Sequence, residues 1–104
     1  MATRSRAVIW AESARNGLDE VIEYIAQDSR DRALQVLNET LEAASTLDKL
    51  AERGRVVPEL NDQDVRELFV FRYRLIYRVL PAQVVIEAFL HGARDFATWR
   101  QGQS

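Results

Sequence analysis

The side chains in this chain that could do chemistry are arginines, one histidine and one phenylalanine, all in its second half. Residues 66–100 include six arginines and only three acidic residues. A guanidinium group binds phosphates and carboxylates through several fixed donors, and an imidazole can act as a general base. This combination suits RNA phosphates and bases, or an acidic, apolar segment of a partner protein. The candidate residues are Arg72, Arg74, Arg78, Phe89, His91 and Arg94.

Ordinary structural roles are open for the same residues. A solvated sheet surface carries cross-strand ion pairs, and Arg74 or Arg78 could pair in this way with Glu87. A single histidine is more often structural than catalytic, so His91 alone does not define an active site. The pattern of residue types therefore indicates a recognition surface without deciding what it binds.

Composition excludes several other kinds of site. The chain of 104 residues has no cysteine and one histidine, which excludes disulfides, thiolate metal sites and a cysteine nucleophile. It also lacks a Gly-rich phosphate loop and a Ser-His-Asp signature, so we expect neither a metal nor another cofactor. No apolar run approaches the ~18–20 residues of a membrane span, and no signal peptide follows the start. We expect a cytoplasmic protein with no membrane partner.

The first half of the chain is predicted to form one strand and two helices. Residues 7–10 are apolar, with β-branched and aromatic members typical of an edge strand. Apolar residues then recur at helical spacing over 14–25 and again over 33–51, which predicts an antiparallel hairpin of amphipathic helices. Ser13 and Ser29 are placed to cap these helices, and Gly54 is placed to end the second.

The second half is predicted to form an antiparallel meander. Segments 65–71, 73–80 and 84–91 are rich in β-branched and aromatic residues, and turn-like residues separate them. A further turn is expected at 61–64, and a short terminal helix after Gly92, with Phe96 and Trp99 covering a core edge. The predicted fold is α+β, with an N-terminal strand and an antiparallel helical hairpin packed on a small antiparallel sheet. Length predicts a single domain over residues 1–104.

Strand alternation predicts which side chains share a face of the sheet. The core face is expected to carry Tyr73, Leu75, Tyr77, Val79, Val84, Ile86, Ala88 and Leu90. The opposite, open face is expected to carry Arg72, Arg74, Ile76, Arg78, Val85, Glu87, Phe89 and His91. Exposed arginines contribute little to stability, so replacing Arg74 with alanine is expected to leave the melting temperature nearly unchanged.

Several short strings resemble the RelE/ParE superfamily of toxins. They are Gly54-Arg-Val-Val-Pro-Glu-Leu60, Arg66-Glu-Leu68, Tyr73-Arg-Leu-Ile-Tyr-Arg-Val79, Val84-Val-Ile86 and His91-Gly-Ala-Arg-Asp95, and residues 18–26 resemble the first helix of that family. The resemblance covers roughly residues 8–96. It implies a β-α-α-β-β-β fold and a bacterial type II toxin that a cognate antitoxin neutralises by direct binding, in a toxin–antitoxin hetero-oligomer.

The superfamily divides by target. RelE-like members cut mRNA in the ribosomal A site, whereas ParE-like members poison DNA gyrase. Arg74 and Arg94 fall on phosphate-contacting arginines of the RelE-like nucleases, and His91 falls where other nucleases of the superfamily place a histidine. The paired lysines and the terminal catalytic tyrosine of RelE-like members have no counterpart in this chain. The resemblance therefore implies catalytic roles for Arg74, His91 and Arg94 only if the chain is RelE-like.

Charge provides a separate argument about the target. A protein that enters the ribosome approaches dense rRNA phosphate, and a basic surface strengthens that encounter. This chain has a net charge of −2. The sequence therefore favours a ParE-like inhibitor of DNA gyrase. An mRNA endoribonuclease that acts with the ribosome is the alternative, and a superfamily member with another or lost activity is a third. The six candidate residues are expected to bind the target or the antitoxin.

Overall fold

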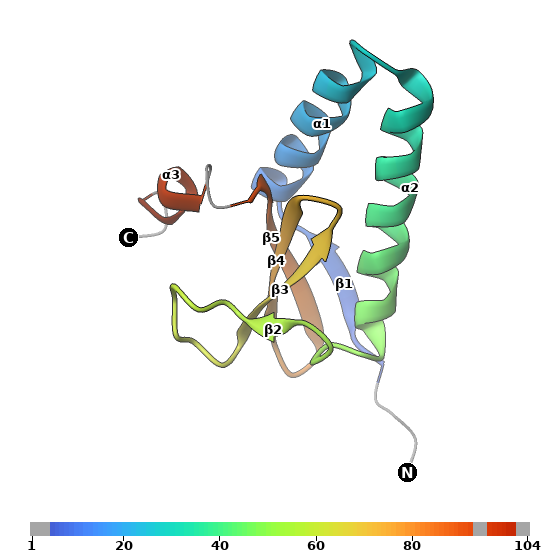
Figure 1. Ribbon diagram of the computed structural model, residues 1–104. Helices are drawn as coiled ribbons and strands as arrows, with labels where there is room; N and C mark the ends of the chain where they lie inside the picture. The colour runs from blue at the N-terminus through green and yellow to red at the C-terminus, as the bar shows by residue number, and fades with distance from the viewer. Residues whose placement is uncertain (1–4, 93–95, 102–104) are drawn as a thin grey trace.

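The computed structural model describes residues 5–92 and 96–101, which form helices and a five-stranded sheet (Figure 1). The predicted α+β class is confirmed. A strand of only two residues, β2, is present in addition to the expected elements. In chain order the elements are β1 (Ala7–Trp10), α1 (Glu12–Ala26), α2 (Arg30–Ser45), the 3₁₀ helix η1 (Thr46–Asp48), β2 (Arg55–Val56), β3 (Val65–Val70), β4 (Tyr73–Val79), β5 (Gln83–His91) and α3 (Phe96–Gln101).

The strand order is β1-β5-β4-β3-β2. β1 lies parallel to β5 at one edge, as predicted for an edge strand, and the remaining neighbours are antiparallel. Helices α1 and α2 form a hairpin whose connection projects past the strands, and α3 lies away from that hairpin (Figure 1). Within the described residues, none of the helices is long and apolar enough to span a bilayer.

Helix α1 packs on β5 through its predicted apolar stripe. Ala14 and Leu18 are buried, and a β-carbon at Gly17 would lie 2.7 Å from the carbonyl oxygen of Phe89. Glycine at this position therefore lets the helix approach the strand closely. The predicted cap by Ser13 is wrong, because its hydroxyl donates to the carbonyl oxygen of Glu87 at 2.7 Å. The cap by Ser29 is confirmed.

Helix α2 departs from the predicted stripe. Leu34 and Leu41 are exposed, whereas Val36 and Thr40 face the core. Thr40 can be buried because its hydroxyl donates to the carbonyl oxygen of Val36 at 2.7 Å. The helix ends at Ser45 rather than near Gly54, because η1 and a turn follow it.

A β-bulge in β5 corrects the predicted faces of that strand. Tyr77 pairs with Ile86, but its neighbour Ile76 pairs with Ala88, so Glu87 is the additional residue. Beyond Glu87 the two faces exchange. The predicted inward positions of Val84 and Ile86 are confirmed, whereas those of Ala88 and Leu90 are wrong.

The sheet is covered on both faces, which corrects the prediction of one open face. The main core lies between the sheet and the helical hairpin and includes Leu75, Tyr77 and Phe89. A second cluster lies on the opposite face and is formed by Val57, Val65, Ile76, Ala88 and Phe96, with Leu60, Leu90 and Trp99 packed against it. The predicted terminal helix is confirmed as α3, and its Phe96 and Trp99 cover this second cluster.

Candidate functional site

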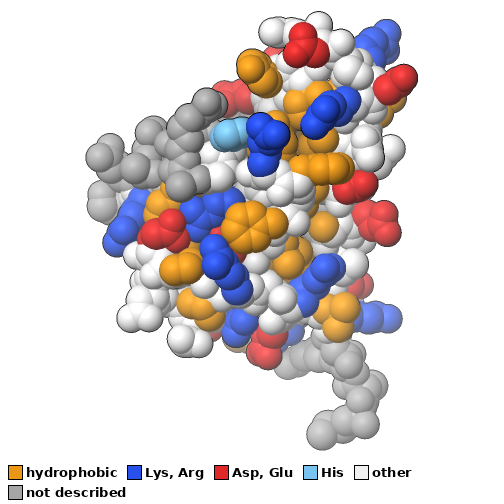
Figure 2. Space-filling view, in the orientation of Figure 1, with side chains coloured by type: hydrophobic (Ala, Val, Ile, Leu, Met, Phe, Trp, Pro, Cys, Tyr) orange, Lys and Arg blue, Asp and Glu red, His pale blue; other side chains and the backbone are white. Residues whose placement is uncertain are grey.

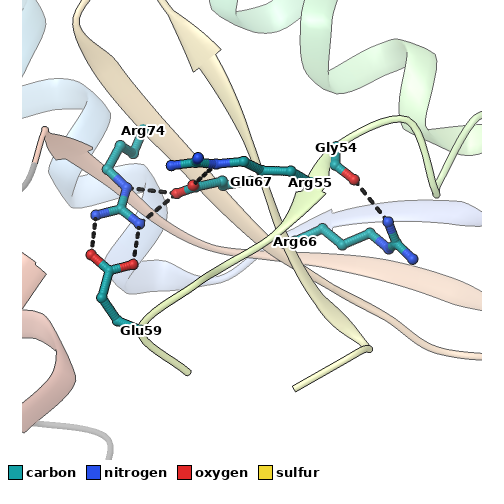
Figure 3. Close-up of polar contacts among 6 residues, drawn as sticks. All are labelled: Gly54, Arg55, Glu59, Arg66, Glu67 and Arg74. Carbon is teal, nitrogen blue, oxygen red and sulfur yellow. Dashed lines mark hydrogen bonds and ion pairs between the residues drawn. The ribbon is translucent and has the colours of Figure 1, made fainter. Parts of the chain in front are cut away.

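Arg74 lies at the centre of a buried network of ion pairs beside the second cluster. Figure 3 shows its guanidinium between two carboxylates, with Arg55 on the far side of one of them. Nε and Nη2 of Arg74 each lie 2.6 Å from Oε1 of Glu67. Nη1 and Nη2 each donate to Glu59 at 3.0 Å, in a bidentate arrangement. All three guanidinium nitrogens are therefore engaged.

The surroundings favour the charged forms of Arg74 and Glu59. Burial alone would lower the pKa of Arg74, but the hydrogen bonds that it donates to Glu59 and Glu67 outweigh this effect and raise the pKa. The hydrogen bond from Arg74 lowers the pKa of Glu59 below its ordinary value. Glu67 is 1% exposed and also accepts a hydrogen bond from Nε of Arg55. The Arg74 network, formed by Arg55, Glu59, Glu67 and Arg74, thus pairs two arginines with two glutamates.

The predicted exposure of Arg74 is wrong. Arg74 is 3% exposed, and its guanidinium carbon lies 4.6 Å from the centre of the Phe96 ring. Alternation correctly directs its side chain away from the helical hairpin, but α3 and Glu59 then cover it. The expectation of an unchanged melting temperature for the alanine variant depended on exposure, so burial of Arg74 removes its premise.

His91 and Phe89 face the helical hairpin rather than the arginines, because they follow the bulge in β5. Phe89 is 2% exposed and stacks on Tyr73, with ring centres 5.4 Å apart. His91 packs edge-on against the Tyr73 ring, with ring centres 5.5 Å apart, and its buried Nδ1 has no hydrogen-bond partner within the described structure. The predicted outward position of both residues is therefore wrong. Arg74 and His91 lie on opposite faces of the sheet.

The remaining candidates are dispersed. Arg78 forms the expected pair with Glu87 at 3.4 Å and also pairs with Asp62 at 3.4 Å. Arg72 is exposed in the turn between β3 and β4. Arg94 lies outside the described residues. Among the residues that the structure describes, only Arg72 of the candidate arginines shares a surface with His91. Arg74 and Arg78 lie elsewhere.

An open groove of about 1210 Å³ separates the end of the helical hairpin from the turn between β3 and β4. Two candidate residues, Arg72 and His91, line it. Its other walls include two aromatic residues that are not among the six candidates, Tyr24 of α1 and Phe71 of the turn. Figure 2 shows hydrophobic, basic and acidic side chains close together on the upper part of this face.

Residues Glu59, Glu67 and Phe71 were missed for different reasons. Glu67 carried a signal, because an acidic residue alternates with apolar ones in a strand next to Arg74. Glu59 reaches Arg74 from a loop, and no local pattern connects the two. Phe71 also carried a signal that was overlooked. It is a bulky residue in a predicted two-residue turn, where Asn or Gly is typical.

The fold has the N-terminal strand, helical hairpin and small sheet that the resemblance to the RelE/ParE superfamily implies. The chain belongs to the family described as the ParE toxin of the type II toxin-antitoxin system, parDE, which it matches over residues 8–96. The superfamily resemblance is thereby confirmed, and its ParE branch is the one supported.

A solved structure agrees with this fold. The structure described as the chromosomal ParDE TA system from P. aeruginosa matches with a TM-score of 0.70. The match covers 86% of this chain and 98% of that chain at 20% sequence identity, so the similarity concerns the fold. No curated protein matches the sequence significantly.

Proposed function

We propose that this ParE-family toxin inhibits DNA gyrase and has no ribonuclease activity of the RelE type. The observation that carries the proposal is the burial of Arg74 between Glu59 and Glu67. A phosphate-contacting arginine needs free donors at a surface that RNA can reach. Arg74 has neither, because its nitrogens are bound to carboxylates and Phe96 covers it.

The position of the histidine supports the same proposal. RNA cleavage by attack of a 2′-hydroxyl needs a general base next to cations that stabilise the charged phosphate. His91 is the single histidine of the chain and lies on the opposite face from Arg74. A net charge of −2 also gives no general attraction to rRNA, whereas a protein target makes no such demand. Among the described residues, Arg74 and His91 therefore do not support the nuclease alternative.

The test is a DNA supercoiling assay with purified toxin and gyrase. We expect loss of supercoiling or accumulation of cleaved DNA as the toxin concentration rises. The matched control is toxin already mixed with its antitoxin, which should leave gyrase active. Normal supercoiling at a large molar excess of folded toxin would overturn the proposal.

We further propose that an antitoxin encoded beside this toxin neutralises it by placing an amphipathic segment in the groove. Arg72 and His91 then contribute to antitoxin binding, whereas Arg74 acts through the fold. Strong induction of the toxin alone should arrest bacterial growth, and co-expression of the antitoxin should restore it. Normal growth under induction of folded toxin would contradict the toxin role itself.

A further inference from the structure

Phe71 occupies a backbone conformation that its side chain disfavours. It is the first of two residues joining β3 to β4, and its φ is +55°. The left-handed region is unfavourable for residues with a β-carbon, and a bulky residue there is unusual. Asn, Asp or Gly would satisfy such a turn with less strain. The turn itself therefore gives no reason for phenylalanine.

Packing within the chain buries only about half of the Phe71 side chain. Phe71 remains 50% exposed. Phe69, two residues earlier, is exposed to a similar extent at 55%, but Arg55 stacks over its ring at 5.1 Å. Among the described residues, Phe71 takes part in no aromatic or cation–π pair. An aromatic residue that is half exposed and held in a strained conformation is a candidate for recognition.

Phe71 lines the groove, and the exposed aromatic Tyr24 lines it from helix α1. Tyr24 is 73% exposed. The partly buried Val21 and Ile25 of the same helix also line the groove and add apolar surface. Aromatic side chains at the border of an apolar groove are typical anchors of protein interfaces, because they bury a large area at small entropic cost.

The charges of the groove differ between its two walls. The helical wall carries Glu20, Asp28 and Asp31 against one cation, Arg32. The opposite wall carries Arg72. A segment that lies between these walls is complementary if it presents basic residues to the helices and an acidic residue to the turn.

We propose that Phe71 and Tyr24 are the specificity-determining anchors that grip an amphipathic antitoxin segment with this distribution of charge. The inference rests on the proposed role of the groove. It assigns most of the binding free energy for the antitoxin to two residues of this chain. Phe71 keeps its unfavourable conformation because the conformation directs its ring into the groove.

The test measures affinity for the antitoxin encoded beside the toxin gene, together with thermal stability. Phe71→Asn suits the left-handed turn and removes the ring. We expect at least tenfold weaker binding, an unchanged or higher melting temperature, and retained toxicity without antitoxin. Phe69→Thr is the matched control. It removes a similarly exposed ring from the other face of the β3–β4 hairpin and should leave affinity unchanged.

A second pair of variants tests the charges. Asp31→Lys reverses a charge on the helical wall and should weaken binding, whereas Glu23→Lys makes the same change at an exposed position of α1 outside the groove and should not.

Three results would overturn this inference, and a fourth would overturn the proposal on which it rests. Unchanged affinity in Phe71→Asn, or an equal loss in Phe69→Thr, would overturn the inference. Self-association of the free toxin that Phe71→Asn abolishes would also overturn it, by assigning the groove to a second copy. Failure of the unaltered toxin to bind the antitoxin would instead overturn the proposed neutralisation through the groove.

Discussion

Replacing Arg74 with alanine is expected to destabilise the protein severely. The change leaves Glu67, whose side chain is fully buried, with Arg55 as its remaining cation, and it releases Glu59. Removing one partner of a buried ion pair costs about 3–5 kcal/mol. The whole free energy of unfolding of a domain of this length is roughly 5–15 kcal/mol. Since 1 kcal/mol corresponds to about 4–8 °C in a domain of this size, the melting temperature should fall by at least about 12 °C.

Thermal and urea unfolding followed by circular dichroism measure this effect. Arg72→Ala is the matched control, because it removes an exposed arginine two residues away and should change stability by less than about 0.5 kcal/mol. A double variant, Arg74→Met with Glu67→Met, should recover most of the loss, because apolar residues can replace a buried pair. If Arg74→Ala unfolds like the unaltered protein but loses toxicity, the structural role of the Arg74 network is refuted.

Three further predictions concern the stability of the same fold. Gly54→Ala should destabilise by about 1–3 kcal/mol in urea unfolding, because its β-carbon would lie 2.5 Å from the hydroxyl oxygen of Tyr77; equal stability would contradict this contact. Leu75→Ala should cost about 2–5 kcal/mol by leaving a core cavity, and a loss below 1 kcal/mol would place Leu75 outside the core. Arg74 lowers the pKa of Glu59, so this pair stabilises the fold above the ordinary glutamate value of 4.5 and the contribution disappears as pH falls through the lowered pKa. Unfolding midpoints measured across that range should depend less on pH in Glu59→Gln, and an unchanged dependence would contradict the pairing.

The sequence predicted the elements well because their signals are local. Apolar residues at helical spacing defined α1, and Ser29 marked the start of α2. Alternation in β4 correctly separated Tyr73, Leu75 and Tyr77 from Arg74. These patterns depend on the geometry of one element, so they can be recognised without knowing its neighbours.

The candidate site was predicted less well because it depends on contacts between distant segments. One bulge at Glu87 moved Phe89 and His91 to the other face, and the anchor of that bulge, Ser13, lies 74 residues earlier. Arg74 was expected at the surface because nothing near it in the sequence indicates that Glu59 and α3 cover it. Alternation gives the direction of a side chain, but burial depends on what packs above it.

The central claim is that this toxin acts without cleaving mRNA, and toeprinting on programmed ribosomes tests it most directly. Purified toxin should leave the mRNA intact at the A-site codon over a range of concentrations that inhibits gyrase. A RelE-family nuclease in the same reaction shows that cleavage would be detected. Clear cleavage at A-site codons by this protein would contradict the account, because Arg74 would then have to leave its two carboxylates to reach the RNA.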